Sequence, residues 1–263
     1  KPYHLNYTVY EEHTATISAS LGAITQDQRG DERNLNIDLR VGDYKLDNTH
    51  QLRGGGPSHV FGNGNMALPL GDDADAVRHA LWYNTDRIFK NSAKRLTQVK
   101  TDLKVKVEEE DRSDDFCREE AHVFYEEPVK LAFDGEAWTK RLRKISAIAR
   151  DFPLIYSSTV TVGAYAGTRY VVTSEGTRLQ TAERRYRVTM SAGTKAEDGM
   201  DLSQYSDFNA ATVERLPDDA KIEEAFRAVI KQVLALREAP LAEPYIGPAI
   251  LRNRASGVFF HEI

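Results

Sequence analysis

The sequence predicts an α+β protein in which antiparallel strand meanders pack with helices. Apolar and polar residues alternate through 3–46 and again through 155–193, a pattern typical of half-buried strands. Apolar residues recur at helical spacing in 72–104, 134–153 and 217–240 instead. Because strands and helices occur in separate blocks rather than in turn, a doubly wound parallel sheet is not expected.

The first meander is expected to contain three alternating runs, "YHLNYTVY" (3–10), "TATISASLGAI" (14–24) and "NLNIDLRVGDYKL" (34–46). We interpret the polar stretch "TQDQRGDER" (25–33) as the hairpin turn between the last two runs. The segment "RGGGPSHVFGNGN" (53–65) is predicted to be a loop, because Gly and Asn interrupt both periods and supply positive φ. Its glycines match neither a P-loop nor a dinucleotide-binding motif.

Three helices are predicted from capping residues and apolar spacing. Each begins next to aspartates, which cap free backbone N–H groups, and two of them stop before a proline. The first helix also carries acids at its start and bases toward its end, as the helix dipole favours. The expected boundaries are Asp72 to Lys104 with Asp72 in the N-cap region, Asp134 to Pro153 with Asp134 as the N-cap, and Pro217 to Pro240.

A second meander is expected over residues 155–193, between the second and third helices. Two short breaks, "AG" at 166–167 and "SEG" at 174–176, are interpreted as turns that separate its alternating runs. The two strand-rich parts could reflect a diverged duplication, but no sequence self-similarity supports one.

Composition excludes some classes of partner. The chain is 41% hydrophobic and 29% charged, as in a soluble globular protein. With a net charge of -5 it has no overall positive field for phosphate, so a nucleic-acid partner is not expected. No stretch reaches the ~20 apolar residues of a membrane helix, so no membrane partner is expected. Cys117 lies among acids, which disfavour a reactive thiolate.

The last residues, "ASGVFFHEI" (255–263), contain the strongest candidate for chemistry. We interpret Ser256 as an N-cap and "GVFFHEI" as a helix with a buried apolar face, from which His261 reaches inward. A neutral imidazole is a zinc ligand, and an adjacent carboxylate is suited to act as general base on a metal-bound water. His261 is therefore the candidate metal ligand and Glu262 the candidate catalytic base. The alternative is an ordinary terminus in which His and Glu are neighbours by chance.

Other groups are weaker candidates. The histidines at 4, 13, 50, 59, 79 and 122 lack the spacing of a helical two-ligand metal site. Paired glutamates at 11, 119, 126 and 223 point in diverging directions on a strand or helix, so they are interpreted as solvated charge.

Three stretches resemble the TldD/PmbA family of zinc metallopeptidases. "PYIGPAILRNRASGVFFHEI" (244–263) is similar to the segment that leads into the family's His-Glu-x-x-x-His motif. "VVTSEGTRLQTAERRYRVTMSAGTKAEDG" (171–199) resembles its S-x-G-T hairpin, and "SASLGAI" (18–24) followed by "LNIDLRVGDYKLDN" (35–48) its opening meander. The resemblance implies a TldD/PmbA N-terminal-domain-like α+β domain over residues 1–250, with residues 251–263 beginning the catalytic helix region.

The resemblance also implies function. It implies zinc as the cofactor, peptides or unfolded polypeptides as substrates, a homo- or heterodimer with a family member, and a cytoplasmic location. Both ends of the chain are expected to be cut from a longer polypeptide, with the remaining zinc ligands beyond residue 263. One imidazole cannot replace three ligands, so the 263 residues are expected to bind zinc weakly. The shortened helix at "VFFHEI" is expected to be poorly ordered or rearranged.

Two other functions remain open. The chain could be a noncatalytic partner or scaffold subunit of a TldD/PmbA-like dimer that binds peptide. The family has also been described as modulating DNA gyrase, but the acidic balance and the absence of a basic stripe weigh against direct contact with DNA. Because both His261 and Glu262 are present, the catalytic interpretation is preferred.

Overall fold

The computed structural model describes residues 1–51, 66–104 and 113–262. Within these ranges, seven strands form one sheet in the order β3-β2-β1-β5-β6-β4, with β7 also paired to β6. Neighbouring strands are antiparallel except β4, which runs parallel to β6. The strands are β1 (Pro2–Ser20), β2 (Ala23–Val41), β3 (Met66–Ala67), β4 (Val123–Tyr125), β5 (Ser157–Thr173), β6 (Arg178–Lys195) and β7 (Asp201–Ala210).

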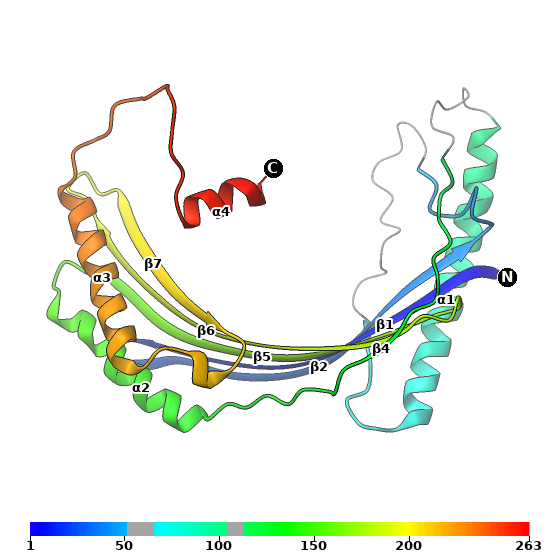
Figure 1. The fold of residues 1–263 in the computed structure, drawn as a ribbon, viewed down its shortest axis with the longest axis horizontal. Coiled ribbons are helices and arrows are strands. Elements are labelled where there is room, and N and C mark those ends of the chain that lie inside the picture. Colours follow the sequence, from blue (N-terminus) through cyan, green and yellow to red (C-terminus); the bar gives the residue numbers. More distant parts are fainter. Residues whose placement is uncertain (52–65, 105–112, 263) are drawn as a thin grey trace.

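The long strands bend together into a trough, and helices lie at both of its ends (Figure 1). The α-helices are α1 (Ala74–Leu103), α2 (Gly135–Ala147), α3 (Asp219–Glu238) and α4 (Arg254–His261). Two short 3₁₀ helices, η1 (Ile148–Asp151) and η2 (Val213–Arg215), join the larger elements. The α+β class with antiparallel meanders and packed helices is confirmed. The two predicted meanders meet where β1 pairs with β5, so they build one sheet.

The first meander contains two strands where three runs were expected. β1 and β2 pair over almost their whole length, and the chain reverses at Leu21 and Gly22, both of which have positive φ. The interpretation of 25–33 as a turn is therefore wrong. Apolar alternation is lost there because these positions on β2 are mostly exposed, and in the described part of the chain no second strand pairs with their outer edge. Strand geometry persists because β1 supplies the hydrogen bonds.

The second meander also differs from the prediction at one break. The "SEG" turn at 174–176 is confirmed, with Gly176 at φ 102. The "AG" at 166–167 is not a turn, since β5 continues through it and both residues pair with β1 and β6. β7 and β4 were not expected, because they follow acidic or turn-forming segments and show little apolar alternation.

The predicted helices are confirmed with small shifts in their ends. Asp73 rather than Asp72 caps α1, accepting hydrogen bonds from two backbone N–H groups. Asp134 caps α2 and Asp218 caps α3, each accepting from an N–H of the first turn. The predicted loop at 53–65 lies outside the described residues.

The larger core lies at one end of the trough, where α2 and α3 pack on the sheet. Ile17, Val162 and Val188 contribute from three adjacent strands, and Trp138 and Phe226 contribute from the two helices. All five are at most 2% exposed. Figure 1 shows these helices outside the curve of the sheet.

A second core lies at the other end, where α1 packs against β2 and β3. Leu35, Ile37 and Leu39 from β2 meet Ile88 and Leu96 from α1. The partly buried residues of β1 in this core are odd-numbered, as are its residues in the larger core. Side chains at alternate strand positions share a face, so α1, α2 and α3 cover the same face of β1. We call it the outer face.

Candidate functional site

The opposite side of the sheet, here called the inner face, is polar. The strand register places the following residues on it: Tyr10, Glu12, Thr14 and Thr16 of β1, Tyr165, Gly167 and Arg169 of β5, Thr181, Glu183, Arg185 and Arg187 of β6, and Tyr205, Asp207 and Asn209 of β7. None of the apolar residues of the two described cores lies among them. Of the helices in Figure 1, α4 is the one within the curve of the sheet.

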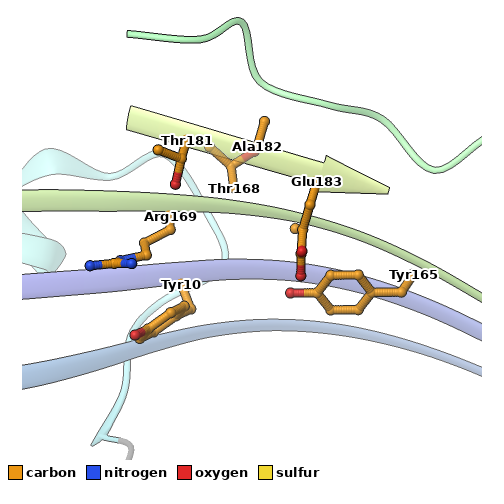
Figure 2. A pocket seen from close by; sticks show the side chains of 8 residues that line it. Tyr10, Tyr165, Thr168, Arg169, Thr181, Ala182 and Glu183 are labelled. Carbon is orange, nitrogen blue, oxygen red and sulfur yellow. The ribbon is translucent and has the colours of Figure 1, made fainter. Parts of the chain in front are cut away.

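A hollow of about 360 Å³ lies where β1, β5 and β6 run side by side. Arg169 and Tyr10 are on one side of it, and Tyr165 and Glu183 are on the other (Figure 2). The hollow exists partly because Gly167, between them on β5, has no side chain. A Cβ atom at this position would collide with the Tyr165 hydroxyl.

Tyr165 is held across Gly167 by a hydrogen bond. Its hydroxyl donates to Glu12 Oε1 at 2.8 Å and points toward Glu183 in Figure 2. Burial raises the pKa of Tyr165 well above its ordinary value, and the hydrogen bond to Glu12 and the charges of Glu12 and Glu183 raise it further. The phenol therefore stays protonated at neutral pH and acts as a hydrogen-bond donor. Arg185 lies over the same ring, with its guanidinium carbon 5.4 Å from the ring centroid.

α4 is fixed to the inner side of the sheet through its first residue. Arg254 donates from Nη2 to Asp207 Oδ1 at 3.0 Å, and its guanidinium lies 4.4 Å from the centroid of the Tyr205 ring. Asp207 also pairs with Arg187 at 3.4 Å. Asp207 and Tyr205 of β7 thus hold α4 against the sheet through Arg254.

The predicted details of this helix need three corrections. Ser256 is not its N-cap, because the helix begins earlier, after Asn253 at φ 51. The apolar face is not buried, since no residue of α4 is buried and Phe260 is 75% exposed. Residues 258–261 are helical, so the expectation that the end of the chain is rearranged is wrong. The contacts of Arg254 give the helix a fixed start.

His261 and Glu262 lie at the C-terminal end of α4. His261 is the last helical residue, and Glu262 is the C-cap, donating its backbone N–H to Val258 O at 3.1 Å. Both side chains are exposed. Their roles as metal ligand and catalytic base stay predictions.

The described residues alone do not fit a complete zinc site. No cluster of three or more potential His, Cys, Asp or Glu ligands occurs among them, so His261 lacks the companions that a zinc centre needs. Three other histidines lie beside acids far from α4 instead. These pairs are His4 with Glu175 at 3.4 Å, His13 with Asp31 at 2.6 Å and His50 with Asp115 at 2.6 Å.

The residues around the hollow were not found by sequence reasoning. They are spread along the chain from Tyr10 to Glu183, and only the strand register brings Tyr10, Arg169 and Thr181 into one row. The available signal is the polar half of the alternating pattern, of which only the paired glutamates are interpreted from the sequence, as solvated charge. Within the described ranges, no helix is long and apolar enough to cross a membrane.

No protein-family model matches the chain, and no curated protein matches it. Several solved structures are similar, and three of them are the following. A candidate modulator of a DNA gyrase from Thermotoga maritima covers 91% of the chain at 11% identity, with a TM-score of 0.51. A candidate modulator of DNA gyrase from Bacteroides thetaiotaomicron covers 88% at 12% identity (TM-score 0.49). TldE from Thermococcus kodakarensis covers 88% at 13% identity (TM-score 0.47).

The chain spans 46%, 45% and 44% of the lengths of these three proteins. At such low identity the likeness concerns the fold and not the activity, and the Thermotoga maritima protein carries the comparison because its TM-score exceeds 0.5. The TldD/PmbA resemblance inferred from the sequence is confirmed at this level: the chain has the α+β fold of the TldD/PmbA-type proteins described as DNA gyrase modulators.

Proposed function

We propose that the chain is the N-terminal part of a zinc-dependent metallopeptidase of the TldD/PmbA type, which hydrolyses peptides or unfolded polypeptides. The observation that supports this is the attachment of α4, which carries His261 and Glu262, to the inner side of the trough through Arg254 and Asp207. A metal-binding helix and a polar, uncovered strand surface then lie on the same side of the molecule. A peptide could extend along that surface.

The two terminal side chains have different roles in this proposal. His261, as a neutral imidazole, would hold the metal together with further ligands that the described residues do not supply. Glu262 accepts the proton of the attacking water and passes it to the departing amine, which requires its carboxylate to be ionised. Zinc, when bound, supplies a Lewis acid that polarises the scissile carbonyl and lowers the pKa of water.

The surrounding residues would position the substrate. The inner face offers hydroxyl, amide, guanidinium and carboxylate groups, which suit the polar backbone of an extended peptide better than an apolar ligand. Pairing with a second family member, as a homo- or heterodimer, and a cytoplasmic location also belong to this proposal.

The test compares two substitutions in the full protein that contains this chain. Glu262→Ala should leave zinc bound while peptide cleavage falls by roughly 10²-fold or more, the typical scale for losing a positioned base. His261→Ala should lose metal and activity together, because it removes a ligand. Zinc content and cleavage of an unstructured peptide are measured on both variants. Glu243→Ala, which removes an exposed acid from the segment before α4, serves as the control. This variant should keep both its zinc and its peptide cleavage.

If Glu262→Ala cleaves the peptide at the parent rate, Glu262 is only a helix-surface acid and the catalytic role is wrong. If the parent binds peptide but neither holds zinc nor cleaves, the alternative of a noncatalytic partner or scaffold subunit replaces the proposal. The exposed aromatic residues Phe259 and Phe260 on α4 would then be candidates for the contact with the partner.

A further inference from the structure

Arg169 is the arginine that lines the hollow of the inner face, and no acid among the described residues pairs with it. Other arginines pair closely with acids, for example Arg33 with Glu11 at 2.8 Å and Arg254 with Asp207 at 3.0 Å. In the part of the chain that the structure describes, Arg169 forms neither an ion pair nor a side-chain hydrogen bond. Its five donors therefore face the hollow and solvent.

Two residues that carry hydroxyl groups flank Arg169 in its row of the sheet. Tyr10 lies directly opposite Arg169 on β1, and Thr181 lies directly opposite it on β6. Side chains that face each other across adjacent antiparallel strands have Cβ atoms about 5 Å apart. A guanidinium between two hydroxyls forms a row of hydrogen-bond donors that suits a carboxylate, which accepts through both oxygens.

The next row of the sheet has the opposite charge. Glu12 and Glu183 are both opposite Gly167, two residues along β5 from Arg169. Two strand positions correspond to about 7 Å, so these carboxylates are close enough to repel an incoming anion. Among the described residues, neither of them forms an ion pair with Arg169. Glu12 is already engaged by the Tyr165 hydroxyl. An anion can therefore be held only on the Arg169 side of the hollow.

We propose that the hollow is a subsite that binds a carboxylate of a peptide, with Arg169 as the charged donor and the hydroxyls of Tyr10 and Thr181 beside it. The inference rests on the proposed function for the choice of a peptide as the ligand. The carboxylate is either the C-terminus of the peptide or the side chain of an Asp or Glu residue. Both sources share the planar, bidentate acceptor that an arginine recognises.

The experiment measures peptide binding by calorimetry in the full protein carrying Glu262→Ala, so that peptides are bound without being cut. Three peptides of one length are compared: one with a free C-terminus and no acidic residue, one amidated with a single internal Glu, and one amidated with no acid. Arg169→Gln removes the guanidinium. Arg184→Gln makes the same charge change on the same strand but on the outer face, since Arg184 alternates with Arg185, and serves as the matched control.

At least one carboxylate-bearing peptide should bind at least tenfold more tightly than the fully neutral peptide, and Arg169→Gln should abolish that difference. Arg184→Gln should preserve it. Whichever of the two carboxylate-bearing peptides binds more tightly identifies the source of the carboxylate. Equal affinity of the parent for all three peptides would overturn the subsite, as would an unchanged preference in Arg169→Gln. A second variant, Arg169→Lys, keeps the charge without the planar fork and should retain only part of the preference.

The outcome is separable from the proposed function. Carboxylate-dependent binding without zinc or cleavage would support the subsite and contradict the peptidase. If cleavage depends on Glu262 but Arg169→Gln changes the affinity for none of the three peptides, the peptidase is supported and the subsite is contradicted. Circular dichroism on each variant confirms that a loss of binding does not come from unfolding.

Discussion

The outer and inner faces of the sheet are built from the same strands but have different roles. On β1, Ala15, Ile17 and Ala19 are buried under helices, whereas Tyr10 and Glu12 on the other face remain partly accessible. Both described cores lie under the helices of the outer face, where burial contributes about 1.5–3 kcal/mol for each large apolar side chain. Substitutions on the outer face should therefore change fold stability, and substitutions on the inner face should change ligand contacts.

The largest expected effect tests the outer face. Phe226 of α3 is 0% exposed within the larger core, so Phe226→Ala should lower the free energy of unfolding by about 3–5 kcal/mol through the cavity it leaves. Arg169→Gln on the inner face should change it by less than about 0.5 kcal/mol. Urea unfolding measures both. If the two substitutions lower the free energy of unfolding equally, the outer face is not the one that stabilises the fold.

A smaller effect sharpens the comparison by contrasting the helices on the two sides. Asp218 caps the buried helix α3, accepting from the Lys221 N–H at 2.9 Å, so Asp218→Ala should cost about 1 kcal/mol of unfolding free energy. Ser256 lies inside the exposed helix α4 and caps nothing. Ser256→Ala should change stability by less than about 0.5 kcal/mol, since Ala is the better helix former. A loss of about 1 kcal/mol in Ser256→Ala would restore Ser256 as a cap.

Sequence reasoning succeeded where local chemistry decides the structure. The three long helices were predicted from aspartate caps and apolar spacing, both of which act within one or two turns. The "SEG" turn was likewise predictable, because Gly176 supplies the positive φ that the turn needs. The fold class followed from the block order of these elements.

The errors arose where distant parts of the chain determine the structure. Residues 25–33 are mostly polar and exposed, so no apolar alternation marks them, although pairing with β1 keeps them in a strand. The hollow depends on a register that joins β1, β5 and β6, and no local pattern specifies which rows face each other. α4 was expected to be buried because its sequence is apolar, but contacts with β7 at its first residue determine its position.

The central claim is that peptide lies in the trough between the inner face and α4. The most direct test is photo-crosslinking in the full protein carrying Glu262→Ala, using an unstructured peptide with one photoreactive residue, followed by mass spectrometry of the attached sites. We expect crosslinks on α4 and on inner-face residues such as Tyr10, Tyr165 and Thr181. An excess of unlabelled peptide should remove all of these crosslinks. Competable crosslinks confined to α1, α2 or α3, on the outer face, would contradict it.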